Sequence, residues 1–222
     1  MANATALVRQ ALHGTGLDVV GSCGVAEYDA CAPADLRSAA ILPGARGVVV
    51  AASSGPGLWR AFRARVDAHR ELWDAAHPYD GFVGELLDRA DAALGAAGVA
   101  FRRFDAGVSA PVRVSFVALG RLTALGAPGP FGLLIHPRHG PWWALRGAWI
   151  VDADVDPAPS LVGACTGCVA PCVGGWDRAG GIPDASVEVR GRCVVGQASR
   201  YDDEQIAYHY DRARTVARLR NG

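Results

Sequence analysis

Aromatic, basic and imidazole side chains are concentrated in residues 136–146, between two apolar runs of the chain. The segment carries two histidines, two arginines and two tryptophans: His136, Arg138, His139, Trp142, Trp143 and Arg146. Guanidinium groups beside aromatic faces suit a large, flat ligand that carries amides or carboxylates. The alternative is a hairpin loop whose tryptophans cover the end of a sheet. Because loops on a scaffold often carry sites, both interpretations stay open.

Four cysteines form the second candidate site, and they are Cys165, Cys168, Cys172 and Cys193. Thiolates at C-x2-C spacing can bind one soft metal ion, and further cysteines can complete a tetrahedron. The bacterial iron–sulfur pattern C-x2-C-x2-C-x3-C-P does not fit, because Val162 and Val173 replace its first cysteine and its proline. A zinc site, an unusual iron–sulfur cluster and a redox-active dithiol remain open, as does a set of small buried residues.

Two further segments carry polar groups. Asp152, Asp154 and Asp156 alternate, and a strand would place them on one face, where they could hold a hard cation. Pro157 stands where a calcium loop needs glycine, so a solvated strand edge is the favoured interpretation. Residues 201–210 predict an acid-capped helix start whose aromatic side chains mostly pack, with Tyr201 or Tyr208 a candidate to line a ligand pocket.

The composition excludes several functions. The 222 residues have 22 basic and 22 acidic side chains, and this neutral balance excludes a general nucleic-acid binder. Lysine is absent, which excludes a Walker-type lysine and a Schiff base. No signal-peptide-like start and no membrane-spanning apolar run is visible, so we expect a cytoplasmic protein without a membrane partner. We expect a single domain over residues 1–222, with a cysteine-rich loop at 157–193.

The elements that must position these residues mix helices and strands. Periodicity predicts helices at 4–13, 58–73, 83–94, 112–125 and 203–220. It predicts strands at 47–52, 99–104, 131–135, 147–155 and 187–189, whereas 14–35 is mostly loop with a short strand and 157–184 is an extended loop. About ten residues join the strands at 131–135 and 147–155, which suits a long hairpin. We therefore expect an α+β fold with a mixed or antiparallel sheet flanked by helices.

Residues 136–147, H-P-R-H-G-P-W-W-A-L-R-G, closely resemble the H-P-R-x-G-x-W-[FW]-A-[IL]-R-G stretch of the cobalamin-processing CblC (MMACHC) family. The runs Leu42-Pro43-Gly44, His77-Pro78-Tyr79-Asp80 and R-Y-D-D-E-Q-I-A-Y at 200–208 are similar to that family in the same order. The resemblance covers roughly residues 40–218. More distantly, residues 105–120 and the cysteine segment resemble the cobalamin domain of epoxyqueuosine reductase and the reductive dehalogenases.

The resemblance implies a nitroreductase-like scaffold, of the flavin-reductase type, that binds cobalamin with its lower base detached from cobalt. Loss of that nitrogen ligand makes cobalt easier to reduce. The family then removes the upper axial ligand and takes part in cobalamin trafficking to an accepting protein. Cyanide leaves reductively with electrons from a reduced flavin (FMN or FAD), and an alkyl group is taken by the thiolate of glutathione or another thiol.

The resemblance also implies roles for particular residues. Residues expected to contact the corrin or its side chains are Asp105, Pro111, Val112, Arg113, Leu125, Leu134 and Leu145. Arg146 and Arg192 match arginines that hold the glutathione carboxylates, a task that suits a bidentate guanidinium. We add His136, Arg138, Trp142, Trp143 and Tyr201 as ligand contacts, with the two tryptophans excluding water. Val117 stands near the position of a histidine that the animal proteins carry.

The cysteine cluster is not a feature of the animal proteins, so thiols, zinc or an iron–sulfur centre at Cys165, Cys168, Cys172 and Cys193 are alternative electron sources. Two other functions therefore stay open. One is an iron–sulfur, cobalamin-dependent reductase that resembles epoxyqueuosine reductase. The other is a non-catalytic cobalamin carrier, which would leave methylcobalamin intact in the presence of glutathione.

Overall fold

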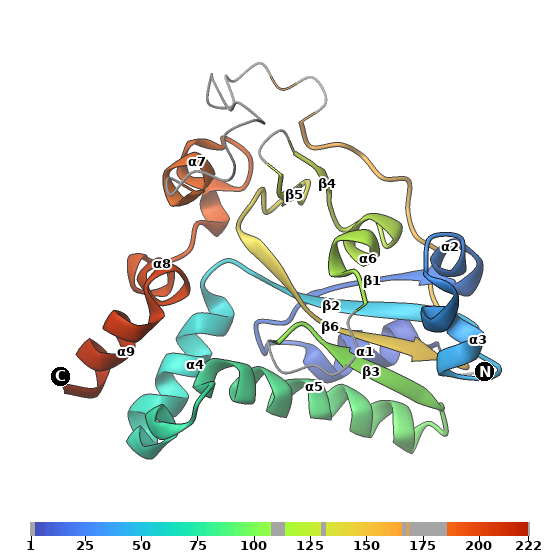
Figure 1. The fold of residues 1–222 in the computed structure, drawn as a ribbon, viewed down its shortest axis with the longest axis horizontal. Helices are drawn as coiled ribbons and strands as arrows, with labels where there is room; N and C mark the ends of the chain where they lie inside the picture. The colour runs from blue at the N-terminus through green and yellow to red at the C-terminus, as the bar shows by residue number, and fades with distance from the viewer. Residues whose placement is uncertain (1–2, 108–113, 130–131, 166–167, 169–185, 222) are drawn as a thin grey trace.

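Four antiparallel strands form the central sheet of the protein (Figure 1). The computed structural model describes residues 3–107, 114–129, 132–165, 168 and 186–221. The strand order is β1-β2-β6-β3, with β1 at Val19–Gly24, β2 at Gly47–Ser54, β6 at Trp143–Val151 and β3 at Phe101–Asp105. Every pairing in this sheet is antiparallel. An antiparallel sheet with helices on both faces confirms the predicted α+β class.

The central strand β2 is apolar on both sides because each side meets a separate hydrophobic core. Its side chains alternate, so Val49 and Ala51 face one core and Val48 and Val50 face the other. The run of valines is therefore the pattern of a strand buried on both faces.

The larger core lies between the sheet and helices α1 (Ala4–Leu12), α4 (Gly57–Ala68) and α5 (Pro78–Ala96). Aromatic side chains dominate it: Trp59, Phe62, Trp73, Tyr79, Trp149 and Tyr208. Trp73 comes from a short 3-10 helix, Arg70–Asp74, that follows α4. Trp149 Nε1 donates a 2.6 Å hydrogen bond to Asp91 Oδ1, which ties β6 to α5.

The second core lies on the other face of the sheet, under α2 (Val25–Asp29), α3 (Ser38–Ile41) and α6 (Phe116–Leu122). A 3-10 helix at Ala34–Leu36 connects α2 to α3, and Tyr28 Oη donates to Leu36 O at 2.7 Å. Ser115 caps α6, because its hydroxyl accepts from the backbone N–H of Ala118.

The remaining elements are the paired short strands β4 (Ala127–Pro128) and β5 (Leu134–Ile135), helix α7 (Ser186–Arg192), a 3-10 helix at Gln197–Ser199, α8 (Asp203–Tyr210) and α9 (Arg212–Asn221). All but α9 lie around the Trp143 end of β6, and α9 packs on α8 and on the 3-10 helix Arg70–Asp74 (Figure 1). Helix α7 and the residue Tyr201 before α8 lie beside Pro141 and Trp142, which directly follow the 136–140 turn.

The expected hairpin between 131–135 and 147–155 is wrong. Strand β5 pairs with β4, and β6 pairs with β2 and β3. Strand β6 begins at Trp143 and ends at Val151, so Trp143 to Arg146 belong to a strand instead of a loop. The three aspartates that were candidates for a cation site follow β6 and bind neighbouring segments of the chain. Asp152 Oδ1 accepts from Ala100 N, Asp154 pairs with Arg46, and Asp156 pairs with Arg9.

Several expected element boundaries are also corrected. Residues 187–189 lie in helix α7 instead of a strand, and the closing helix of 203–220 is divided at Asp211 into α8 and α9. Helix α6 spans Phe116–Leu122 instead of 112–125, α5 begins at Pro78 instead of residue 83, and α4 ends at Ala68. Among the described residues, no helix is both long enough and apolar enough to cross a membrane.

Candidate functional site

The turn from His136 to Gly140 is held by its own backbone and by the His136 ring. The amide N–H groups of these two residues donate to each other's carbonyl oxygens at 2.9 Å. His136 Nδ1 accepts from the N–H groups of Arg138 (3.0 Å) and His139 (3.2 Å). Burial, with His139 and Arg138 nearby, lowers the pKa of His136 to about 4. His136 is therefore a neutral acceptor that shapes the turn.

Two glycines allow this turn to contact the segment after α7. Gly140 has a φ of +58°, and a Cβ there would lie 1.9 Å from Val195 O. Gly196 has a φ of +75°, and a Cβ there would lie 2.1 Å from the carbonyl carbon of His139. His139 Nδ1 also lies 2.8 Å from Ser199 Oγ. This close backbone contact fixes α7 and α8 against the 136–146 segment.

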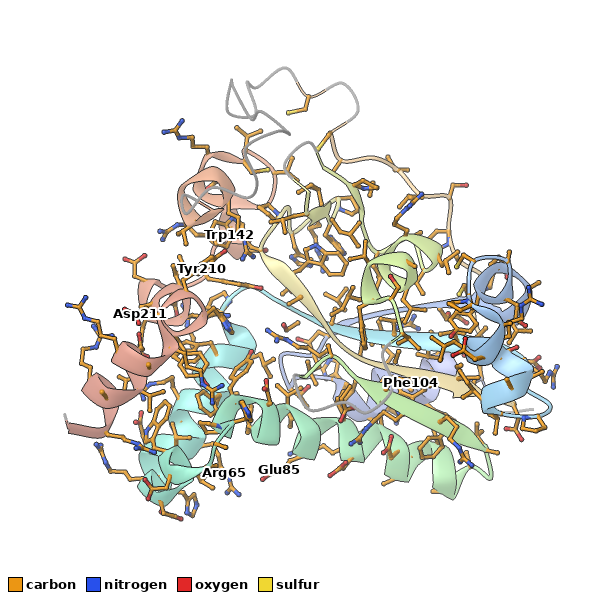
Figure 2. The ribbon with its side chains drawn as sticks, in the orientation of Figure 1. Arg65, Glu85, Phe104, Trp142, Tyr210 and Asp211 are labelled. Atoms are coloured by element: carbon orange, nitrogen blue, oxygen red, sulfur yellow. The ribbon has the colours of Figure 1, made fainter. Side chains whose placement is uncertain are left out.

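Both tryptophans are interior side chains. Trp143 Nε1 donates to Leu134 O at 2.9 Å, and its ring packs against Gly120 and Gly126. Trp142 is completely buried, with the Arg190 guanidinium 4.9 Å from its ring centroid. Figure 2 shows Trp142 between the end of β6 and α7. The pair therefore fixes the start of β6 between α6 on one side and α7 on the other.

Arg146 lies in β6 and its guanidinium is held by two neighbouring elements. Its Nε donates to Ser53 Oγ at 3.1 Å, and Nη2 donates to Tyr79 Oη at 3.3 Å. The guanidinium carbon lies 5.1 Å from the centroid of the Tyr79 ring. Burial raises the pKa of Tyr79 to about 12, although Arg146 acts in the opposite direction. Tyr79 therefore stays a phenol that orients the guanidinium.

His209 of α8 lies near both Arg146 and Arg190 of α7. The His209 ring centroid is 5.4 Å from that of Tyr79 and 6.0 Å from that of Tyr201. Arg190 lies 5.1 Å from the Tyr201 ring centroid, and its Nη2 donates to Pro141 O at 2.5 Å. We call these residues the arginine–histidine cluster: Tyr79, Arg146, Arg190, Tyr201 and His209.

Polar atoms of this cluster are buried without partners. Within the part of the chain that the structure describes, Arg190 Nε, Tyr201 Oη and His209 Nε2 make no hydrogen bond. Such groups cost roughly 1–3 kcal/mol each when they are left unpaired, so these three atoms are suited to bind water or the polar groups of a ligand. Two guanidiniums beside a neutral imidazole and two phenols suit an anion that also carries a hydrogen-bond donor.

The leucines expected to contact the corrin do lie together. Leu125, Leu134 and Leu145 pack around Trp143, at the same end of β6. Asp105 ends β3 opposite Gly147, and Arg103 Nε lies 2.9 Å from its carboxylate. The other three expected contacts, Pro111, Val112 and Arg113, lie outside the described residues.

Sequence reasoning missed three members of the arginine–histidine cluster. Arg192, which the resemblance implied, is exposed on α7, whereas Arg190 on the same helix contacts Trp142 and Tyr201. Tyr79 is the third residue of the H-P-Y-D motif, and His209 directly follows R-Y-D-D-E-Q-I-A-Y. Tyr201 was expected and is present. Arg138 is exposed, and its Nε lies 3.2 Å from His139 Nε2.

The cysteines lie near the turn. Cys193 is buried beside Ile135, and Cys165 packs against the same small group. The backbone N–H of Cys168 donates to Cys165 O at 3.2 Å, and Cys172 lies outside the described residues. Among the described residues, no group of three or more cysteine, histidine, aspartate or glutamate side chains could hold a metal ion. The four-cysteine site therefore stays a prediction.

Comparison with solved structures identifies the fold. No protein-family model and no curated protein sequence matches the chain. The B12-trafficking protein CblC of C. elegans, a homologue of human MMACHC, superposes with a TM-score of 0.61 at 16% identity, covering 96% of this chain and 94% of that chain.

Epoxyqueuosine reductase matches less completely. Its selenomethionine-labelled crystal structure gives a TM-score of 0.51 at 15% identity, covering 77% of this chain and 52% of that chain. The complex of that reductase with an epoxyqueuosine-modified tRNA-Tyr stem loop gives 0.50 at 15% identity, covering 77% and 51%. The protein therefore has the nitroreductase-like α+β fold of a CblC protein, as the 136–147 motif predicts.

Proposed function

We propose that this protein binds cobalamin with its lower base detached, removes the upper axial ligand and delivers the product to an accepting protein. The motif at 136–147 and the fold shared with a B12-trafficking protein support this function. The arginine–histidine cluster is the observation that carries it. Arg146 of the motif lies there beside three buried polar atoms that have no partner among the described residues.

The geometry of β6 suggests how one ligand could contact both the leucines around Trp143 and the arginine–histidine cluster. Successive side chains of a strand point to opposite faces, so Leu145 joins the leucines while Arg146 joins Tyr79. Strand β3 ends at Asp105, so residues 143–145 have no strand partner on that side within the described residues. We infer that the corrin, as substrate, lies along this edge of β6, between the leucines and the arginines.

The chain's own groups then have distinct tasks. The three leucines, which pack on the buried Trp143, offer apolar contact area to the corrin and exclude water from its upper face. Arg146 and Arg190 bind the carboxylates of glutathione or another anionic thiol, with Arg192 on the same helix as a further contact. For cyanide removal, a reduced flavin (FMN or FAD) is the electron donor that the family resemblance implies.

The direct test is spectroscopic. Cyanocobalamin, methylcobalamin and aquocobalamin are each titrated anaerobically with purified protein while the visible spectrum is recorded. We expect the spectral change of base detachment, followed by loss of the alkylcobalamin spectrum when glutathione is added, with S-methylglutathione detected by mass spectrometry. An unchanged spectrum at excess protein would reject cobalamin binding, and binding without thioether formation would indicate a carrier.

The cysteines favour a second candidate function, because Cys165 and Cys193 pack against the same buried residue, Ile135. We propose that Cys165, Cys168, Cys172 and Cys193 form a zinc, iron–sulfur or dithiol centre beside the cobalamin. Metal and acid-labile sulfide are measured on the preparation used for the titration. Stoichiometric iron and sulfide would favour an iron–sulfur reductase, zinc would favour a structural site, and no metal would leave the dithiol.

A further inference from the structure

His209 is the member of the arginine–histidine cluster whose chemistry the proposed function does not yet use. It lies in the last turn of α8, and its Nε2 is buried without a hydrogen-bond partner within the described part of the chain. Charged and titratable groups face it from each neighbouring element: Arg146 from β6, Arg190 from α7, Tyr79 from α5 and Tyr201 from the segment before α8.

The imidazole is neutral at physiological pH. Burial lowers the pKa of His209 to about 4, and the positive charges of Arg146 and Arg190 act in the same direction. A neutral imidazole always has one nitrogen with a free lone pair. Neither the arginines, which stay protonated, nor Tyr79, whose pKa is raised to about 12, can accept a proton. His209 is thus the basic group of this cluster.

We propose, resting on the proposed function, that His209 Nε2 accepts the thiol proton of the anionic thiol that Arg146 and Arg190 bind. The carboxylates of that thiol neutralise the two guanidiniums, which removes the repulsion that otherwise opposes an imidazolium at this position. Burial and the two arginines together keep His209 unprotonated when no anion is bound, and the anionic substrate removes the part that is due to the arginines.

The step balances without a further reactant. The S–H bond breaks, its electron pair stays on sulfur, and the proton forms the Nε2–H bond of His209. The thiolate then attacks the alkyl carbon, an S–C bond forms, and the C–Co bond breaks with both electrons remaining on cobalt. Cobalt is reduced from Co(III) to Co(I), the product is a thioether, and His209 returns its proton to solvent when the thioether leaves.

The test compares the wild-type protein with His209→Gln, which can accept a hydrogen bond but not a proton. Thiol-dependent demethylation of methylcobalamin is measured from about pH 6 to about pH 9, a range that spans the ordinary thiol pKa. We expect the variant to lose about 100-fold at the acidic end and to recover as the free thiol ionises. His13→Gln, an exposed histidine after α1, is the matched control and should retain the wild-type profile.

A second measurement uses the wild-type protein alone, in case the variant does not fold. Calorimetric titrations of the protein with glutathione, and with S-methylglutathione, which has no thiol proton, are run in buffers of different ionisation enthalpy to count the protons released. Thiolate absorbance is recorded in parallel. Thiolate formation without proton release to the buffer supports the proposal. Thiolate formation with one proton released, or an unchanged profile for His209→Gln, overturns it while the proposed function stands. Absence of any wild-type demethylation contradicts the proposed function itself.

Discussion

At the residue scale, the family resemblance assigns thiol binding to Arg192 of α7, whereas the structure places Arg190 of the same helix in the arginine–histidine cluster. Arg190 stacks on Trp142 and Tyr201 and donates to Pro141 O, whereas Arg192 is exposed. A partly buried guanidinium that aromatic rings and a carbonyl already hold loses little side-chain entropy when it binds a carboxylate, and we therefore expect Arg190 to contribute more to thiol binding than the exposed Arg192.

We therefore predict that Arg190→Ala raises the KM for glutathione by about 10- to 100-fold, the loss expected for one or two hydrogen bonds to a charged group. Steady-state demethylation of methylcobalamin at varied glutathione measures it, with the exposed Arg214→Ala of α9 as control. Cobalamin binding should be unaffected. A larger effect of Arg192→Ala than of Arg190→Ala would restore the assignment that the sequence resemblance implies.

The lowered pKa of His209 also predicts a pH dependence of stability. The unfolded chain binds a proton near pH 6.5, but the folded chain does not bind it until the pH reaches about 4. The contribution of His209 is therefore fully present above about pH 6.5 and is lost as the pH falls toward 4, by at most about 3 kcal/mol of unfolding free energy.

Urea denaturation of the wild-type protein and His209→Gln between pH 7 and about pH 4.5 measures this loss. The variant should show a shallower decline than the wild type, because glutamine does not titrate. The remaining decline is expected from His136, whose pKa is lowered in the same direction. Parallel curves for the two proteins would show that His209 takes up its proton at the same pH in the folded and the unfolded chain.

At the scale of elements, the contact between the 136–140 turn and the segment after α7 depends on backbone approach. At Gly140 a Cβ would overlap Val195 O, and its φ of +58° is unfavourable for other residues. We predict that Gly140→Ala lowers the unfolding free energy by about 3 kcal/mol or more, since both strain and overlap must be relieved.

Gly84→Ala is the matched comparison, because a Cβ at this position of α5 would meet nothing within 4 Å. Alanine should stabilise the helix by about 0.5–1 kcal/mol. The two substitutions add the same methyl group, and chemical denaturation should therefore give changes of opposite sign. Equal small changes at both positions would mean that the turn and the 195–199 segment separate easily.

The same elements explain which parts of the fold could be predicted from the sequence. Helix α1 and strands β2 and β3 follow from local periodicity, and their positions were predicted closely. Strand pairing was not, because the partners of β6 come from residues 47–54 and 101–105, far along the chain. Helix α7 has valines that favour a strand, and its contact with the 136–146 segment is tertiary. The sequence motif identified Arg146, but Arg190 and His209 join it only through this packing.

At the scale of the whole molecule, the central sheet separates two cores that share the same strands. Val49 and Val50 are neighbours in β2, yet one side chain enters the core under α4 and α5 and the other enters the core under α2 and α6. Both are completely buried. Because every backbone displacement of β2 disturbs both cores, we expect them to unfold as one unit, which is also what a single domain over residues 1–222 requires.

The prediction is that Val49→Ala and Val50→Ala each lower the unfolding free energy by about 2 kcal/mol, the loss expected for two buried methyl groups. Far-ultraviolet circular dichroism follows both cores, whereas tryptophan fluorescence is weighted to the first, through Trp59, Trp73 and Trp149. Val117→Ala at an exposed position of α6 should change the free energy by less than about 0.5 kcal/mol. If Val50→Ala moved the circular dichroism transition without moving the fluorescence transition, the two cores would be independent folding units, and β2 would not couple them.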